Sequence, residues 1–323
     1  MKILFVTATR IGDAVLSTGL LAYLIGRYPG AEFTVAAGPL AAPLFEAMPG
    51  LKRLIVVDKQ SYARHWMKLY LAVAATRWDL VVDLRSSALA YLLWAGQRRR
   101  VAKSEVGEHR VRQLGKLFNL DPPPAPQLWF GQKHIAMAAS LVPPGERFIA
   151  IGPAANWRGK EWRAEYFAEL ANHLTSAQGL FPGARVAVLA AAHERPQAQP
   201  MIDALPRGKA IDLVGGTDLL TAGAVLQRAA LYVGNDTGLT HIAAASGAPT
   251  LALFGPSLAW KYAPWGKRAE IVPTATPYAE LFPPGWDHRT IGTMMDSITV
   301  EAVEHGAVRL LARISAEKVM EKA

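Results

Sequence analysis

The 323-residue sequence contains no cysteine. Disulfide bonds, cysteine-ligated zinc, iron–sulfur clusters and thiol catalysis are therefore excluded, and the composition suits a reducing compartment. No apolar run approaches the ~20 residues that a membrane-spanning helix needs. Zinc-finger spacing, aromatic RNA-binding signatures and long basic tails are also missing. For this reason we expect no nucleic acid among the partners.

Metal-ligand patterns are missing as well. The eight histidines are scattered and no Asp-x-Asp pair occurs, so we predict neither a metal site nor a cofactor. The N-terminal apolar run, residues 2–8, is interrupted by Arg10 and Asp13 too soon for a signal sequence. We therefore interpret this run as a first buried strand and expect a cytoplasmic protein.

The sequence does contain enough apolar residues for two cores, together with an excess of positive charge. Apolar residues make up 51% and charged residues 19% of the chain, which is typical of globular proteins. The length allows two domains. The net charge of +9 favours polyanionic partners, which here means phosphorylated substrates or an anionic membrane face.

Short apolar runs alternate with helical stretches along the first part of the chain. This alternation predicts βαβ units and a parallel, doubly wound α/β sheet. We expect strands at 2–8, 32–37, 53–57, 79–83 and 99–102 and helices over 14–27 and 61–76.

Two proline-rich breaks, residues 121–126 and 143–146, interrupt this pattern, and a short helix is expected between them over 132–141. Because the alternation then restarts, we predict an N-terminal domain at 1–145 and a C-terminal domain at 146–298. A last helix within 299–323 suits either half, including a return to the first. The second half is expected to hold strands at 147–151, 185–190, 209–213, 231–233 and 250–254 and helices over 163–177, 194–205, 219–229 and 239–246.

One stretch joins a strand to a helix through Gly-Asn-Asp-Thr-Gly, residues 234–238. The backbone N–H groups at such a helix start, together with the helix dipole, form an anion site that most often binds phosphate. Asp236 or Thr237 can cap the helix, and His241 falls about one turn into it. The alternative is a capped helix that binds no ligand.

Other strand-to-helix turns also carry charged residues. Asp13 begins the first helix, where it either caps the helix or serves as a general base, and Gly12 lets a ligand approach the backbone. In the loop 152–162, Lys160 either neutralises a diphosphate leaving group or is a solvated surface cation. After a third strand, Glu194 either binds ribose hydroxyls or only favours the next helix N-terminus.

Six cations of the first domain are candidates for binding an anionic acceptor or a membrane face, although each alone is most often a solvated residue. They are Arg10, Lys59, Arg64, Lys68, Arg110 and Arg112. The helix over 61–76 mixes apolar and basic residues. It either docks shallowly at a membrane interface or packs on its own sheet.

Three stretches together resemble glycosyltransferase family 9, the heptosyltransferases of lipopolysaccharide core assembly. They are Arg10-Ile11-Gly12-Asp13, Lys160-Glu161-Trp162, and Gly234–His241 followed by Leu253-Phe254-Gly255-Pro256. The resemblance runs nearly the whole length of the chain. It implies a GT-B architecture of two facing Rossmann-like domains with a cleft between them, the acceptor on the first domain and the nucleotide-sugar on the second.

The resemblance also implies roles for individual residues. Asp13 would deprotonate the acceptor hydroxyl for a single inverting displacement, which would need no metal. Lys160 would hold the diphosphate during catalysis, and Glu194 would bind the ribose. The full set of donor contacts would be Gly12, Asn156, Lys160, Glu194, Asn235, Asp236, Thr237, Gly238 and His241.

The predicted function is therefore metal-independent, inverting transfer of heptose from ADP-heptose to an anionic lipopolysaccharide-core acceptor. We expect a monomer that contacts the inner face of the cytoplasmic membrane peripherally. Three alternatives stay open. They are a transferase of the same fold with another donor or acceptor, a nucleotide-sugar 2-epimerase, and a non-catalytic nucleotide-sugar-binding protein. An epimerase would consume the donor without an acceptor, and a binding protein would show no turnover.

Overall fold

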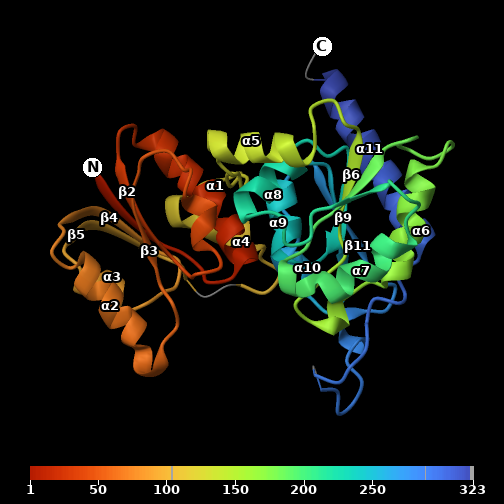
Figure 1. The fold of residues 1–323 in the computed structure, drawn as a ribbon. Helices are drawn as coiled ribbons and strands as arrows, with labels where there is room; N and C mark the ends of the chain where they lie inside the picture. Colours follow the sequence, from red (N-terminus) through yellow and green to blue (C-terminus); the bar gives the residue numbers. More distant parts are fainter. Residues whose placement is uncertain (103–104, 288, 321–323) are drawn as a thin grey trace. The chain divides into compact units, whose positions relative to one another are not determined.

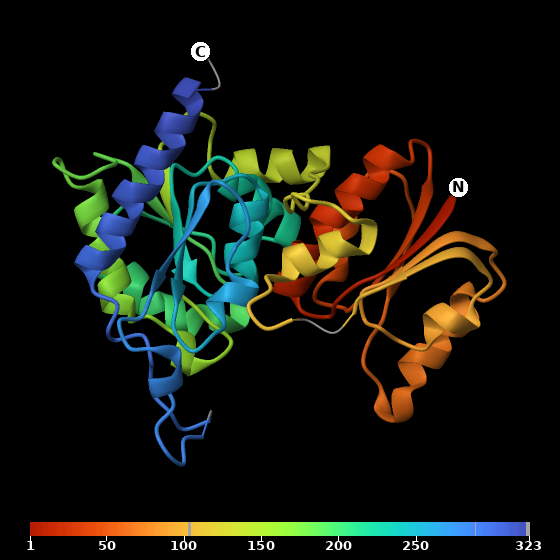
Figure 2. The same cartoon turned by 180° about the vertical axis from the view of Figure 1, so that it is seen from behind.

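The structure, a computed structural model, describes residues 1–102, 105–287 and 289–320. It divides into two compact units, Met1–Gly131 and Gln132–Ala323. In each unit helices cover both faces of one parallel β-sheet (Figures 1 and 2). The predicted α/β class with two Rossmann-like domains is confirmed.

The first sheet has the strand order β3-β2-β1-β4-β5, and every neighbouring pair is parallel. Helices α1 and α4 cover one face, and α2 and α3 cover the other (Figure 1). The strands are β1 (Lys2–Val6), β2 (Glu32–Ala37), β3 (Leu51–Val56), β4 (Trp78–Asp83) and β5 (Ala95–Arg100). The helices are α1 (Ile11–Arg27), α2 (Arg64–Val73), α3 (Leu89–Leu92) and α4 (Arg110–Gly115), with 3-10 turns at Ala42–Phe45, Ser61–Ala63 and Lys116–Phe118.

The second sheet has the order β11-β10-β9-β6-β7-β8, again with parallel pairs throughout. The order reverses between β6 and β9, which is where doubly wound folds bind ligands at the carboxyl ends of their strands. The strands are β6 (Phe148–Gly152), β7 (Arg185–Val188), β8 (Ala210–Asp212), β9 (Tyr232–Asn235), β10 (Thr250–Phe254) and β11 (Ala269–Pro273). The helices are α5 (Gln132–Leu141), α6 (Ala164–Thr175), α7 (Arg195–Ala204), α8 (Leu219–Leu226), α9 (Gly238–Ala245), α10 (Ala259–Tyr262) and α11 (Val300–Met320), with 3-10 turns at Arg158–Lys160, Ala192–Glu194 and Tyr278–Glu280.

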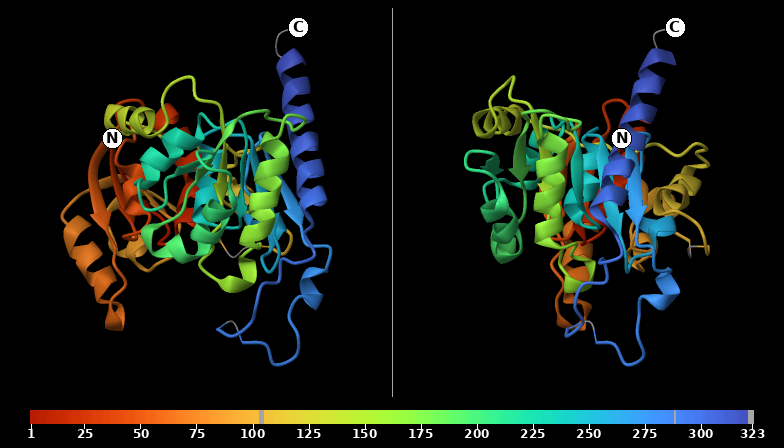
Figure 3. Two further views of the ribbon diagram at one scale, coloured as in Figure 1. Left: turned by 45° about the vertical axis from the view of Figure 1, so that its right-hand side comes forward. Right: turned by 90° about the vertical axis from the view of Figure 1, so that its right-hand side faces the viewer.

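The domain limits differ from the predicted ones. The units divide at Gly131 instead of at residue 145, because α5 packs on α8 and so belongs to the second unit. The last helix, α11, packs on α6, β10 and β11, all of which belong to that unit (Figure 3). Residues 321–323 of the predicted last helix lie outside the described residues.

The sequence analysis missed one strand, β11. Its short sequence follows Lys267 and Arg268, includes Glu270 and ends at Pro273. Charged residues and proline are common on edge strands because they discourage pairing with other chains. The charged residues and the proline that suit β11 to the sheet edge also interrupt its apolar run, so the sequence did not predict this strand.

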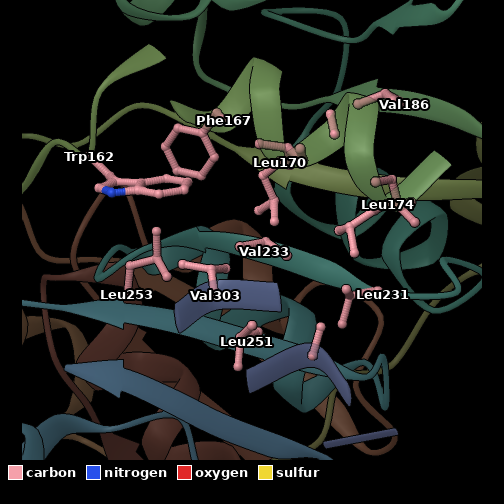
Figure 4. Packing of buried hydrophobic residues seen from close by; sticks show 14 of the residues in the cluster. Trp162, Phe167, Leu170, Leu174, Val186, Leu231, Val233, Leu251, Leu253 and Val303 are labelled. Atoms are coloured by element: carbon pink, nitrogen blue, oxygen red, sulfur yellow. The ribbon is translucent and has the colours of Figure 1, made fainter. Parts of the chain in front are cut away.

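The core of the second unit begins directly beside the candidate site. Trp162 is almost fully buried, and its ring meets the Phe167 ring edge-on at a centroid distance of 4.8 Å. Figure 4 shows both rings above the apolar side chains of β9 and β10. The indole N–H donates to the backbone carbonyl of Ile298 at 2.8 Å, so the large apolar ring is buried without an unpaired donor. The loop before α6 is thereby fixed to the core.

Two glycines make room for a buried tyrosine on the opposite face of the same sheet. Gly152 and Gly234 are register partners on β6 and β9, and a Cβ on either would collide with the Tyr232 hydroxyl. That hydroxyl lies 3.1 Å from the Thr240 hydroxyl, which in turn donates to the carbonyl of Asn235. Burial raises the pKa of Tyr232, so the phenol stays protonated. The chain of hydroxyl groups ties the first turn of α9 to the end of β9.

Gly152→Ala is expected to lower the free energy of unfolding by about 1–3 kcal/mol, the usual cost of overpacking. In a Tyr232→Phe background the cost should be smaller, because the colliding hydroxyl is gone. A double-mutant cycle by urea unfolding measures the difference. The matched control is Gly26→Ala, since a Cβ at this helical glycine meets nothing within 4 Å. Equal costs of Gly152→Ala in both backgrounds would contradict the assigned contact.

Candidate active site

Four neighbouring strands of the second sheet, β10, β9, β6 and β7, end at the same edge because all of them are parallel. The loops after these strands carry most of the residues that the sequence analysis selected. Doubly wound folds bind ligands at this edge, where the strand order reverses. The arrangement therefore brings together residues that are up to a hundred positions apart in sequence.

A partly buried ion pair forms the centre of this edge. The Lys160 ammonium, after β6, lies 2.6 Å from the Asp236 carboxylate, after β9. The same carboxylate oxygen accepts a second hydrogen bond, also 2.6 Å, from the Ser257 hydroxyl after β10. The Lys160 and Asp236 side chains are only 22% and 11% exposed, so the attraction between them is less screened than on an open surface.

The start of α9 lies beside this pair. His241 is almost buried, with its Nε2 atom 3.9 Å from the second carboxylate oxygen of Asp236. Thr237 occupies the N-cap position of α9, as predicted, but makes no side-chain capping bond. By contrast, Asp218 caps α8 by accepting from the Thr221 N–H at 2.8 Å. Because no side chain caps α9 from its N-cap position, the first-turn N–H groups are suited to an anionic ligand.

Asn235 braces two loops of the site. Its carboxamide is fully buried, donates to the carbonyl of Pro153 at 2.7 Å and accepts from the Trp162 N–H at 3.1 Å. These bonds connect both ends of the loop that carries Lys160. Both polar groups of the amide bind the backbone, and the role of Asn235 as a donor contact stays a prediction.

Gln197 on α7 is a second brace, and the sequence analysis missed it. Its amide N–H groups donate to the Ala155 carbonyl at 3.2 Å and to the Glu161 carboxylate at 2.8 Å. Its amide oxygen accepts from the Ala155 N–H at 3.3 Å. Burial raises the pKa of Glu161. Within the same loop, the backbone carbonyl of Gly159 accepts a 3.0 Å bond from the N–H of Met294.

Two further predicted donor residues lie at the same edge. Glu194 follows β7 and is half-buried, with one carboxylate oxygen 2.8 Å from the Ala191 N–H. This bond corresponds to the structural alternative, a carboxylate that stabilises the next helix start, and it leaves the second oxygen for a ligand. Asn156 is exposed in the loop after β6.

Asp13 lies in the first unit, in the first turn of α1 after β1. Its side chain is half-buried, and no residue in the described part of the chain forms a hydrogen bond or ion pair with its carboxylate. The turn before Asp13 packs closely on Gly38, because a Cβ at Gly38 would collide with Thr9 in that turn. Gly12 is half-buried beside Asp13. An ionised carboxylate at a helix start is stabilised by the helix dipole, as a general base requires.

The loop after β4 borders the same edge of the first sheet and was not selected from the sequence. The fully buried Asp83 carboxylate accepts from the N–H groups of Arg85 and Ser87, at 2.8 and 2.7 Å, and from the Ser87 hydroxyl. Arg110, one of the six predicted acceptor cations, reaches this loop with a 3.4 Å bond to the Leu84 carbonyl. The buried Asp83 carboxylate therefore fixes the conformation of the loop after β4.

The other predicted acceptor cations are dispersed over the first unit. Arg10 is the exposed residue before α1, and Lys59 is exposed after β3. Arg64 and Lys68 are exposed on α2, and Lys68 also lines a groove of about 280 Å³ beside β3. Arg112 is exposed on α4. The six cations come from four segments of the first unit, namely the turn before α1, the loop after β3, α2 and α4.

The pattern of glycosyltransferase family 9 (heptosyltransferase) matches residues 66–281, about two-thirds of the chain. The chain belongs to glycosyltransferase family 9. It is similar to lipopolysaccharide heptosyltransferase 2 of Escherichia coli (strain K12), with 26% identity over 319 residues that cover 87% of this chain and 90% of the relative.

Solved structures agree with this family 9 assignment. The family 9 glycosyl transferase from Veillonella parvula DSM 2008 has a TM-score of 0.78 at 19% identity, covering 96% of this chain and 97% of the other. Escherichia coli heptosyltransferase WaaC with ADP has a TM-score of 0.71 at 20% identity, covering 96% and 100%. The likeness concerns the fold and confirms the GT-B class. The protein is a glycosyltransferase.

Within the described residues, no three His, Asp or Glu side chains lie close enough to hold a metal ion. Among the helices that the structure describes, none is both long and apolar enough to cross a membrane.

Asn235→Ala is expected to lower the free energy of unfolding by about 2–4 kcal/mol, because it leaves two buried backbone groups without partners. Thermal and urea unfolding of the purified protein measure this loss. Asn172→Ala, at a partly exposed asparagine within α6, provides the comparison. A loss no larger than that of the control would show that Asn235 is not a brace.

Proposed function

We propose that the protein transfers heptose from ADP-heptose to an anionic acceptor of the lipopolysaccharide core, by a metal-independent, inverting displacement. The observation that carries the proposal is the Lys160–Asp236 pair beside the uncapped start of α9. The relative from Escherichia coli is named a lipopolysaccharide heptosyltransferase, and a solved structural neighbour is a heptosyltransferase with ADP. Both names agree with a donor of this class.

The donor is proposed to lie along the carboxyl edge of the second sheet. Its diphosphate would contact Lys160 and the N–H groups at Gly238 and beyond, with Thr237 and Asp236 near the phosphates and sugar. The ribose would bind the free oxygen of Glu194, whose strand β7 adjoins β6. This order of contacts supports the proposal because it follows the strand order β9-β6-β7 without a break.

In the proposed chemical step, Asp13 accepts the proton of the acceptor hydroxyl. The hydroxyl oxygen then bonds to the anomeric carbon from the face opposite the diphosphate, and the bond from that carbon to the diphosphate oxygen breaks. One displacement of this kind inverts the anomeric configuration. The half-buried Asp13 carboxylate, with no partner in the described part of the chain, is suited to receive the proton.

The departing diphosphate needs positive charge in its neighbourhood. Lys160 supplies a full charge, and the start of α9 supplies oriented N–H dipoles. Preorganised groups of this kind stabilise a developing anion without having to reorient during the reaction. Because they supply the positive charge that a metal would otherwise supply, the proposal includes no metal. His241, next to Asp236, is proposed to contact the same diphosphate.

Asp13→Asn is expected to lower kcat by about 10²–10⁴-fold, the usual contribution of a general base, and to leave ADP-heptose affinity unchanged. Transfer is measured with purified donor and acceptor, and donor binding by calorimetry. Glu32→Gln changes an exposed carboxylate of the same unit and should alter neither quantity. Loss of donor binding together with activity would contradict the base role.

Lys160→Met is expected to weaken ADP binding by about 10- to 100-fold, because charge-assisted hydrogen bonds to phosphate are lost. Calorimetric titration with ADP, UDP and GDP, with and without a chelator, measures the effect. The unsubstituted protein should prefer ADP and ignore the chelator. Arg163→Met removes a nearby cation that pairs with Asp296 on the open surface and should leave binding unchanged. A preference for UDP would contradict ADP-heptose as the donor, although it would be compatible with the GT-B fold.

A further inference from the structure

Apolar side chains project into solvent from one face of the first unit. Six of them are at least 60% exposed, which is unusual for large apolar residues gathered on neighbouring elements. They are Tyr62, Met67, Leu71, Tyr91, Leu92 and Trp94, and we refer to them and the cations around them as the α2–α3 surface.

The two helices that carry this surface lie side by side on one face of the first sheet (Figures 1 and 2). Leu69 and Val73 of α2 and Leu89 of α3 are buried in the same core cluster. The exposed residues Met67 and Leu71 are four positions apart on the remaining, outward face of α2. Each helix therefore packs one apolar side on its own core. Met67 and Leu71 form a second apolar ridge on the outward side of α2.

Two cation–ring contacts connect the helices at their ends. The Arg85 guanidinium lies 5.2 Å from the ring centre of Trp66, joining the loop before α3 to α2. The Arg77 guanidinium lies 5.2 Å from the ring centre of Trp94, joining the end of α2 to the end of α3. These contacts hold the cations at the rim of the apolar ridge.

Much of the net charge of the chain comes from the segment that contains both helices and the three strands around them. Residues 51–100 contain ten Lys and Arg residues against three Asp, a net charge of +7 out of +9 for the chain. Of the three acids, Asp83 is fully buried and Asp79 accepts from the N–H of Lys2 at 2.6 Å. Neither α2 nor α3 contains an acidic residue.

We infer that the α2–α3 surface docks the enzyme on an anionic lipid bilayer. Exposed aromatic and aliphatic side chains enter the boundary between headgroups and acyl chains, and the flanking arginines and lysines bind the anionic headgroups. The inference rests on the proposed function for the identity of the membrane-bound acceptor, whereas the docking itself needs no substrate.

Charge complementarity favours a bilayer over a second copy of the chain. A two-fold contact through this surface would bring together the acid-free helices of two copies, among them the basic α2. Such like-charge contacts oppose association. An anionic bilayer meets the same cations with opposite charge over its whole area.

The sequence allows two alternatives for the helix over 61–76, shallow docking at a membrane interface or packing on its own sheet. Trp66 and Tyr70, the aromatic residues of that helix, pack partly buried against the core together with Leu69. The exposed apolar ridge comes instead from Met67 and Leu71, and from α3, which was not predicted.

Vesicle flotation tests the inference. The unsubstituted protein is expected to float with vesicles of equal parts phosphatidylcholine and phosphatidylglycerol, and not with phosphatidylcholine alone. Raising NaCl from about 0.1 M to about 1 M shortens the screening length from ~10 Å to ~3 Å and should release most of the protein.

Met67→Ser with Leu71→Ser is expected to lower the partition coefficient at least tenfold, because it removes only the outward apolar ridge. Arg64→Gln with Lys68→Gln should lower it about 20- to 30-fold, at about fivefold for each cation. Ile135→Ser with Met137→Ser changes two side chains of α5 that are 46% and 51% exposed, and should leave flotation unchanged.

Two results would overturn the inference. One is flotation that the Met67/Leu71 variant retains in full. The other is that the unsubstituted protein forms a concentration-dependent dimer, seen by light scattering, whereas the Met67/Leu71 variant is monomeric and still floats. Transfer to a lipid-free acceptor separates this inference from the proposed function, because the Met67/Leu71 variant should keep that activity. If the unsubstituted protein floats normally but transfers no heptose, the result would count against the proposed function and not against the docking.

Discussion

The ion pair between Lys160 and Asp236 determines how the rest of the candidate site is organised. Two charges that are only 22% and 11% exposed stabilise each other, and removing one leaves the other at high cost. The pair keeps the ammonium in place before any ligand arrives. In the proposed function, an incoming diphosphate shares or takes over this lysine, while Ser257 still donates to the Asp236 carboxylate. The pair thus positions the cation next to the N–H groups of α9.

Buried polar groups hold the loops on either side of this pair. Asn235 and Gln197 use side-chain amides to satisfy backbone groups that would otherwise be buried without partners. Such braces are needed because the loop that carries Lys160 is irregular and has no ladder of its own. Fixed loops also suit catalysis, since preorganised groups need no reorganisation when charge develops.

The arrangement of strands and helices was predictable where the pattern was local. Alternating apolar runs identified the parallel sheets, and the turn at 234–238 identified a helix start at the correct place. The division at Gly131 was not predictable, because it depends on the packing of α5 against α8, and the proline breaks only mark irregular chain. The exposed ridge on α2 was missed because helical spacing alone does not say which of two apolar stripes faces the core.

The candidate site was predictable only in part. A resemblance to a family singled out Lys160 and Asp236, which are 76 positions apart, but no pattern in one sequence predicts that they touch. Ser257 was missed because a serine after a strand has no signal of its own until its partner is known. Gln197 was missed for the same reason, since its partners lie 36 and 42 positions away. Side-chain contacts between loops of different strands are properties of the fold, not of a sequence window.

Cations near the candidate site and cations on the α2–α3 surface are held in different ways. In the second unit Lys160, Arg163 and Arg195 each pair with a carboxylate, so their fields are largely cancelled at a distance. On the α2–α3 surface, Arg77 and Arg85 lie over aromatic rings, which attract a cation without neutralising its charge. Compensated cations respond to a ligand that enters the site itself. Uncompensated cations project a field outwards and draw in any extended anionic surface. Under the proposed function and the proposed docking, the same residue type would select a phosphate group at the candidate site and attract an anionic bilayer at the α2–α3 surface.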